Sequence, residues 1–303
     1  MKLIKYFNIR DLLLLVVGML TLKVGFLDQQ PGALQALNLA EYLLLVLATV
    51  LVAAGGFFMN NVFGFGKDAN PEITESKGYN IYFALNIIGI GIVYYLANSL
   101  GKPMLLTGLY VFAAATMYFY ATSLKEMLVA NNIITAVLTA LPVITVGLFQ
   151  LFPILGIVPE DAKPMVSMLF TLFIDYSVFT FFVALALGII NDIATTDADY
   201  NSGVNTLPIL IGRERSAKIA IGLTAIPVVL FVYYADKYLL QLIYALAYGV
   251  VFIVGLLAYS IIRLLQAKSA KDFTHIAGVV KLVLLFVAFF SAVLTYNINH
   301  VKQ

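Results

Sequence analysis

Long apolar segments are the feature that most restricts the fold of this chain. A helix needs about 20 consecutive apolar residues to cross the hydrocarbon core of a bilayer. Segments of this kind follow one another near residues 11–28, 39–59, 79–99, 103–121, 132–153, 165–190, 216–235, 238–264 and 277–298. Because lipid offers a backbone no hydrogen-bond partners, an α-helix is expected in each. The sequence therefore predicts an all-α integral membrane protein with nine transmembrane helices.

The composition supports this prediction and excludes several classes of protein. Of the 303 residues, 62% are hydrophobic and 11% are charged, whereas a soluble domain carries about 25% charged residues. There is no cysteine and there are two histidines, so a thiolate or classical histidine metal centre is not expected. The net charge of +2 gives no indication of a nucleic-acid partner.

Basic residues are distributed unevenly over the loops. If the N-terminus is cytoplasmic, the cytoplasmic segments hold twelve of them, namely Lys2, Lys5, Arg10, Lys67, Lys77, Lys125, Arg213, Arg215, Lys218, Arg263, Lys268 and Lys271. The opposite side then holds four, which are Lys102, Lys163, Lys237 and Lys302. The positive-inside rule therefore predicts a cytoplasmic N-terminus. It also places two polar loops, 60–79 and 192–216, on the cytoplasmic side.

The first polar loop reads NNVFGFGKDANPE from Asn60. If the preceding helix continues, Asn60, Gly64 and Asp68 share one helical face at spacings of four residues. Gly64 contributes no ligand, and Asn61 is a neighbouring oxygen donor. This loop thus offers amide and carboxylate oxygens from one helix end.

The second polar loop reads NDIATTDADYNSGVNTLPILIG from Asn191. Asp192 and Asp199 are seven residues apart, and seven steps of about 100° return almost to the starting direction. The two carboxylates are therefore expected to face the same way. Asp197 points elsewhere on an ideal helix and joins them only if the chain has left helical geometry, which Gly203 and Pro208 indicate soon after.

Carboxylate and amide oxygens without nitrogen or sulfur donors are typical ligands of Mg²⁺, which completes its shell with water and phosphate oxygens. A diphosphate substrate would supply such phosphate oxygens. Neighbouring cations, namely Lys67, Lys77, Lys125 and Arg10, are placed to neutralise its charge. The simpler interpretation, that both loops are merely solvated, stays open on spacing alone.

Three stretches resemble known motifs of one family. DIATTDADYNSGVNTLPILIG, from Asp192, resembles the second aspartate-rich motif of the UbiA superfamily of intramembrane prenyltransferases. GGFFMNNVFGFGKDANPE, from Gly55, resembles the first such motif. YATSLKEMLVAN, from Tyr120, resembles the family's Tyr and Lys segment after the fourth span. The segment containing Thr-Leu-Pro is the most specific of the three.

The resemblance implies a fold and a chemistry. The fold would be a UbiA-like bundle of nine helices over a single transmembrane domain, residues 1–303, with a central cavity opening near the cytoplasmic face. The chemistry would be magnesium-dependent transfer of an isoprenyl group from an allylic isoprenyl diphosphate to a lipid or aromatic acceptor within the membrane, which would itself be lipid-soluble or amphipathic. Metal and cationic groups stabilise charge on the leaving diphosphate, and an apolar cavity protects the allylic cation from water.

The resemblance also assigns residues to roles. The first metal site falls to Asn60, Asn61 and Asp68, and the second to Asp192 and Asp199 with Asp197 as a helper. Asp68, Asp192 and Asp199 are the expected catalytic residues. Diphosphate contacts fall to Tyr120 and Lys125, with Lys77 and Arg10 as further candidates, and Asn60 and Asn61 also border the substrate.

This chain departs from the family pattern at Asn61, Gly64 and Thr195, where aspartates are usual. Fewer anionic ligands should weaken Mg²⁺ binding. An alternative is therefore a catalytically reduced or inactive relative that binds or transports lipid. A CDP-alcohol phosphotransferase is set aside because its DGxxAR core is absent.

The motifs most resemble bacterial geranylgeranylglycerol-phosphate geranylgeranyltransferase-like members, with quinone-pathway enzymes close behind. The expected location is the bacterial inner membrane. Asp175 lies in the sixth predicted span, too far from Asp192 to share its metal, and is expected to form a cavity wall or an interhelical hydrogen bond to Tyr or Ser. Lys23 lies near a span end and is expected to extend to the interface.

Overall fold

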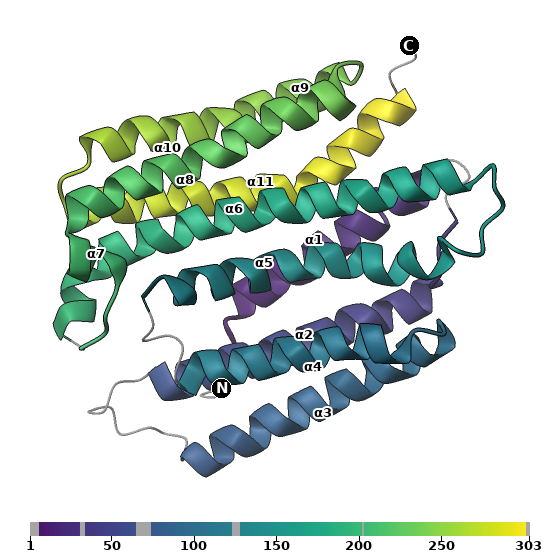
Figure 1. Cartoon of the computed structure of the whole chain (residues 1–303), viewed down its shortest axis with the longest axis horizontal. Helices are drawn as coiled ribbons and strands as arrows, with labels where there is room; N and C mark the ends of the chain where they lie inside the picture. The colour runs from purple at the N-terminus through teal and green to yellow at the C-terminus, as the bar shows by residue number, and fades with distance from the viewer. Residues whose placement is uncertain (1–5, 31–33, 65–73, 123–127, 202, 301–303) are drawn as a thin grey trace. The chain divides into compact units, whose positions relative to one another are not determined.

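The computed structural model describes residues 6–30, 34–64, 74–122, 128–201 and 203–300, and these residues form helices and connecting turns. Figure 1 shows the helices in chain order. The longer helices are α1 (Ile9–Lys23), α2 (Leu39–Gly64), α3 (Glu75–Ser99), α4 (Pro103–Thr122), α5 (Leu128–Gln150), α6 (Lys163–Asn201), α8 (Arg213–Tyr234), α10 (Gly255–Gln266) and α11 (Ala270–His300). The shorter ones are η2 (Leu27–Gln29), η4 (Phe152–Ile154), α7 (Leu207–Ile211), η5 (Ala235–Leu239), α9 (Ile243–Tyr248) and η6 (Gly249–Val254).

Eight helical segments in the described part of the chain are long and apolar enough to cross a membrane. They correspond to the second to ninth predicted spans. The first predicted span contains α1, which has 15 residues and is about 22 Å long at 1.5 Å per residue. This is shorter than a hydrocarbon core of about 30 Å. The all-α membrane architecture is confirmed, and the ninth crossing stays a prediction.

The chain divides into two compact units. Unit 1 comprises residues 1–19, 32–125 and 142–174, and unit 2 comprises residues 20–31, 126–141 and 175–303. Helices α1, α5 and α6 each contribute residues to both units. The expectation of a single domain stays a prediction.

Unit 1 is built around α2, α3 and α4, which pack against one another (Figure 1). The α2 helix begins with a capping box, because Asn38 Oδ1 accepts from the Glu41 amide at 3.0 Å and Glu41 Oε2 accepts from the Asn38 amide at 2.9 Å. Close packing depends on Gly56, where a Cβ would lie 2.2 Å from Sδ of Met117. The hydroxyls of Thr49 and Tyr110 hydrogen-bond at 2.5 Å and join α2 to α4 inside this unit.

Unit 2 contains α8 to α11, with α10 packed against both α8 and α11. Two π-helical segments, η5 and η6, interrupt the α-helical geometry after α8 and α9. Gly249 opens η6 and faces the Phe231 ring, to which a Cβ would come within 2.3 Å. The ring centroids of Phe231 and Phe290 lie 6.4 Å apart, so α8, η6 and α11 share one aromatic contact region.

Two charged residues of unit 2, Asp175 and Lys23, lie in apolar helices and form polar contacts there. Asp175 Oδ2 accepts hydrogen bonds from Tyr238 Oη at 2.7 Å and from Lys237 Nζ at 2.9 Å. This agrees with the expected hydrogen bond to a tyrosine and ties α6 to η5. The expectation for Lys23 is wrong: its side chain is 5% exposed and pairs with Asp28 at 2.5 Å.

The α6 helix is 39 residues long and continues well beyond the predicted span end at residue 190. Its apolar stripe persists past that point, since Ile193 is fully buried, and no Gly or Pro intervenes before Gly203. Gly203 adopts the left-handed conformation with φ 70°. The Val204 amide then donates to the Asp199 carbonyl at 3.0 Å, which is a glycine-based helix end. The second motif therefore lies on a continuous helix.

Candidate functional site

The last three turns of α6 carry the aspartates of the second motif. Asp192 and Asp199 are two turns apart on this helix and share a face, as their spacing predicts. Thr195 lies between them, and its hydroxyl is 2.7 Å from Asp199 Oδ2 and 3.0 Å from the Asn191 carbonyl oxygen. The shorter contact is to the carboxylate, so Thr195 orients Asp199 where an aspartate ligand is usual in the family pattern.

Asp192 is held by a residue from α5. Its Oδ2 accepts a hydrogen bond from Asn132 Nδ2 at 2.6 Å, and both side chains are buried, with 9% of Asp192 and 3% of Asn132 exposed. Gly188 lies one turn before Asp192 against the Asn132 amide. Sequence reasoning missed Asn132, and the signal for it was a pair of asparagines, Asn131 and Asn132, at the start of an apolar span.

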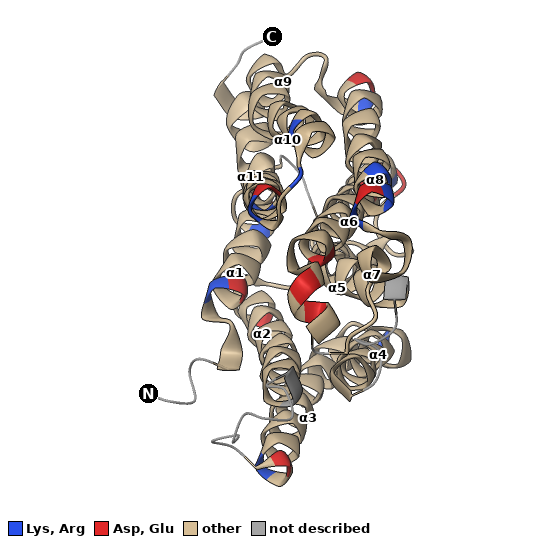
Figure 2. Cartoon of the chain, turned by 90° about the vertical axis from the view of Figure 1, so that its left-hand side faces the viewer, with Lys and Arg blue, Asp and Glu red and all other residues tan. Residues whose placement is uncertain are grey.

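Asp197 lies away from this face. Its Oδ2 is 2.7 Å from an Nη atom of Arg213 in the first turn of α8. Figure 2 shows the charged start of α8 in blue and red. The ion pair fixes the end of α6 to α8 within unit 2, so the structure does not bring Asp197 to the face of Asp192 and Asp199.

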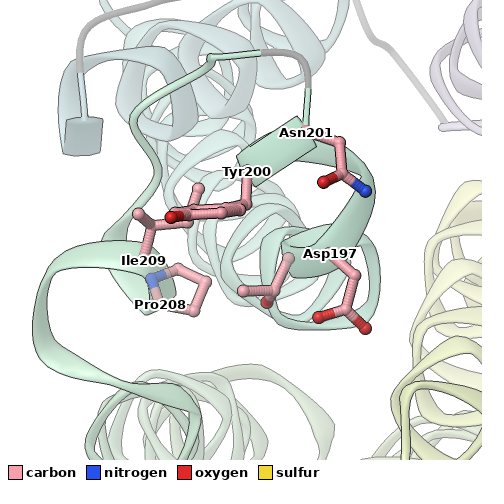
Figure 3. Close-up of a pocket in the computed structure, with 6 residues that line it drawn as sticks. Asp197, Tyr200, Asn201, Pro208 and Ile209 are labelled. Carbon is pink, nitrogen blue, oxygen red and sulfur yellow. The ribbon is translucent and has the colours of Figure 1, made fainter.

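A hollow of about 440 Å³ adjoins Asp197. Figure 3 shows the Tyr200 ring beside Ile209 and Pro208 of α7, with Asp197 and Asn201 on neighbouring turns of α6. Thr196 completes its lining. On a helix of about 100° per residue, these α6 residues lie to one side of the face that carries Asp192 and Asp199.

In unit 1, Asn61 joins the end of α2 to the segment before α1. Its Nδ2 donates to the Tyr6 carbonyl oxygen at 2.8 Å and to Asn8 Oδ1 at 3.0 Å. Asn8 has a positive φ of 47°, and its carbonyl oxygen accepts from the amides of Asp11 and Leu12 in the first turn of α1. Both amide hydrogens of Asn61 are thus used, which leaves its Oδ1 as the atom for a ligand.

Some of the other predicted site residues lie within the described residues, and some lie outside them. Asn60 and Tyr120 are half-buried at the ends of α2 and α4, and Arg10 and Lys77 are exposed in the first turns of α1 and α3. Arg10 follows Asn8 by two residues, so it lies at the same end of unit 1 as Asn61. Asp68, Lys67 and Lys125 lie outside the described residues.

The α6 donors fit magnesium by their chemistry. Asp192 and Asp199 each have one oxygen hydrogen-bonded by a neutral donor, while the other oxygen makes no hydrogen bond within the described part of the chain. No three His, Cys, Asp or Glu side chains converge among the described residues. Mg²⁺ typically takes one or two protein carboxylates and completes its shell with water and phosphate oxygens, so two carboxylates suffice.

The fold and this site define a helical integral membrane protein in which the end of one helix carries an acidic face, with a carboxylate that accepts a hydrogen bond from a buried amide. Residues 30–283 match the sequence profile of the UbiA prenyltransferase family, and the chain belongs to this family. It is accordingly a prenyltransferase. This confirms the family indicated by the three motifs.

The chain is also similar to named relatives and, in its fold, to a solved structure. The chain is 25% identical over 231 residues to a digeranylgeranylglyceryl phosphate synthase of Sulfolobus acidocaldarius, covering 73% of this chain and 72% of the relative. It is 28% identical over 203 residues to the protein of the same name from Thermococcus kodakarensis, covering 65% and 66%. A structure from a study of digeranylgeranylglyceryl phosphate synthase in membranes superposes with a TM-score of 0.65 at 17% identity, over 97% of this chain and 99% of that chain. The last similarity supports the fold alone.

Proposed function

We propose that this protein transfers a geranylgeranyl group from geranylgeranyl diphosphate to a glyceryl phosphate lipid, with Mg²⁺ as its cofactor. Family membership supports transfer of an isoprenyl group to a lipid acceptor. The names of the archaeal relatives support the particular donor and acceptor. The observation that carries the proposal is the α6 face, where Asp192 and Asp199 each keep one oxygen outside the hydrogen bonds formed among the described residues.

In this proposal, Asp192 and Asp199 hold magnesium from the second motif. Asn60, Asn61 and Asp68 supply oxygens from the first motif, Asn61 through Oδ1 because its amide hydrogens are bonded to Tyr6 and Asn8. When bound, Mg²⁺ held by these residues would supply positive charge to the diphosphate leaving group. Asp197 acts differently from the expected helper ligand, because it orients Arg213.

The remaining candidates bind the negative charge of the diphosphate. Tyr120 lies in the last turn of α4, and Lys125 comes after that helix in the sequence. Arg10 and Lys77 are exposed cations in the first turns of two helices of unit 1. Charge-assisted hydrogen bonds to phosphate oxygens are stronger than neutral ones. These residues therefore contribute to donor binding, while the apolar helices exclude water from the reacting carbon.

A second candidate function is lipid binding or transport without catalysis. The observation that favours it is Thr195, which occupies a usual ligand position and instead donates to Asp199. Thr195 and Asn61 are both neutral at positions where aspartates are usual, so less negative charge is available to a metal. Product analysis separates the two functions, because flux of lipid across liposomes without a new ether product supports only transport.

The test is binding of geranylgeranyl diphosphate to purified protein with and without Mg²⁺. We expect binding by wild type to require the metal and to be lost in Asp192→Ala. Asp161→Ala is the matched control, because Asp161 is an exposed aspartate in the connection before α6 and should bind as wild type does. Binding that ignores both Mg²⁺ and Asp192→Ala would contradict the assigned site.

The location of the chain in the membrane is part of the proposal. We propose a cytoplasmic N-terminus from the excess of basic residues in alternate loops. The placement in a bacterial inner membrane stays a prediction, since the relatives named above are archaeal.

A further inference from the structure

Asn132 is the residue around which the carboxylate of Asp192 is organised. We propose that Asn132 is a positioning residue for the metal and diphosphate site, and that Gly188 supplies the space in which it acts. Asn132 holds Asp192 Oδ2 at 2.6 Å, which leaves Oδ1 as the oxygen presented to a cation. The inference rests on the proposed function and adds to it two residues outside the aspartate motifs.

The chemistry of the donor suits this role. A buried carboxylate needs hydrogen-bond donors, and leaving it without one is costly. A lysine or arginine would satisfy Asp192 but would also cancel its charge. The neutral amide of Asn132 satisfies one oxygen and leaves the negative charge for a bound cation. Asn132 is 3% exposed, so its amide is fixed by packing and its hydrogen bond sets the direction of the carboxylate.

Gly188 makes this arrangement sterically possible. A Cβ at residue 188 would lie 2.5 Å from Asn132 Oδ1 and 3.1 Å from Cγ. The first distance is shorter than real Cβ contacts and the second is tighter than most of them, so a larger residue would displace the amide. The Asn132 Cβ itself would lie at 3.4 Å, which is close to ordinary contact. The conflict is therefore with the amide group and not with the α5 backbone.

The same pattern recurs two turns later. Asp199 Oδ2 is held by the Thr195 hydroxyl at 2.7 Å, again a neutral donor that engages one oxygen and leaves the other. Two carboxylates on one face thus receive equivalent support, one from α5 and one from α6 itself. If Asn132 served only to join α5 to α6, there would be no reason for Asp199 to have an equivalent neutral donor.

The experiment measures the Mn²⁺ concentration that gives half-maximal binding of geranylgeranyl diphosphate, in wild type, Asn132→Ala, Gly188→Ala, the double variant and Asn131→Ala. Loss of a residue that orients a metal ligand typically weakens metal affinity by about 10- to 100-fold. We expect a shift of at least about 10-fold for Asn132→Ala and for Gly188→Ala. Asn131→Ala, at the neighbouring asparagine of the same helix, should match wild type.

The double variant separates positioning from general damage. Without the Asn132 amide, the added methyl of Gly188→Ala would have no neighbour nearer than about 3.4 Å among the described residues, which is ordinary contact, so the double variant should be no worse than Asn132→Ala. A purely structural role would lower the amount of protein that binds, or its melting temperature, and leave the Mn²⁺ midpoint unchanged. That result would overturn the inference.

Asp192→Ala distinguishes failure of this inference from failure of the proposed function. If Asp192→Ala raises the midpoint and Asn132→Ala and Gly188→Ala do not, the inference alone is wrong. If wild type shows no dependence on Mn²⁺, or Asp192→Ala has no effect, the metal site and the inference fall together. Should Asn132→Ala not fold in detergent, Gly188→Ala carries the same test.

Discussion

Single side chains around α6 decide which oxygens are available for chemistry. Asp199 has one oxygen engaged by a neutral hydroxyl, whereas Asp197 is paired with a full positive charge on Arg213. The two residues are two positions apart and are about 200° apart around the helix. Residues with the same carboxylate therefore have different roles because of what faces them.

Replacing each of these aspartates by asparagine tests this distinction. We expect Asp199→Asn to lower prenyl transfer by about 10²-fold, the scale on which loss of one charge-stabilising group acts. Asp197→Asn removes the Arg213 ion pair, which is about one-third exposed at the arginine, and should change the rate by less than about threefold. Steady-state kcat/KM with geranylgeranyl diphosphate is the measurement. Equal losses in both variants would show that the helix faces are assigned wrongly.

At the scale of elements, packing decides where helices lose regular geometry. The η6 segment is π-helical and begins at Gly249, which faces Phe231. The Phe231 ring is in turn packed near Phe290 of α11. The absence of a side chain at residue 249 is thus what lets α8 and η6 approach each other closely.

We expect Gly249→Ala to destabilise the protein by about 1–3 kcal/mol, the usual cost of adding a methyl group to a packed contact. Gly222→Ala in α8 is the matched control, because a Cβ there meets no atom of the described residues within 4 Å. It should be neutral or stabilising by up to about 1 kcal/mol, since alanine favours helix over glycine. Melting temperatures in one detergent give the comparison, and an unchanged melting temperature for Gly249→Ala would refute the packing argument.

The sequence was sufficient for most helices and for part of the site. Apolar length located the second to ninth spans, and the seven-residue spacing put Asp192 and Asp199 on one face. The end of α6 was placed too early because hydropathy falls after residue 190, although burial of Ile193 carries the helix onward. Asn132 and the partner of Asp197 were missed because both depend on which helices pack together, and periodicity along one helix carries no such information.

At the scale of the whole molecule, the topology depends on whether the N-terminal segment crosses the membrane. At 15 residues α1 is too short to cross alone, so a crossing requires the turns after Lys23 as well. The eight candidate spans found in the described part of the chain would by themselves leave both ends on one side, and a ninth crossing would put them on opposite sides. The lack of cysteine in the chain allows this to be tested by single substitutions.

Labelling intact cells with a membrane-impermeant maleimide measures the topology. Glu160 and Glu214 have side chains that are 87% and 86% exposed, so Glu160→Cys and Glu214→Cys react equally once the membrane is opened. We expect Glu160→Cys to react in intact cells and Glu214→Cys to react only after lysis. Ile9→Cys, at an exposed residue, should follow Glu214→Cys. Reaction of Ile9→Cys in intact cells would show that the N-terminal segment does not cross.

The continuity of α6 has a consequence for how insertions and deletions act on this protein. Between Asp175, which is anchored to η5, and Asp192, the helix has no break. Removing one residue there would turn the acidic face by about 100° and move it by about 1.5 Å, whereas removing seven would restore its direction and shift it by about 10 Å. The position of the acidic face along α6 can therefore change without a change in the direction in which that face points. Length changes in multiples of seven residues are the ones that would alter the level of the aspartates and preserve the direction in which they point.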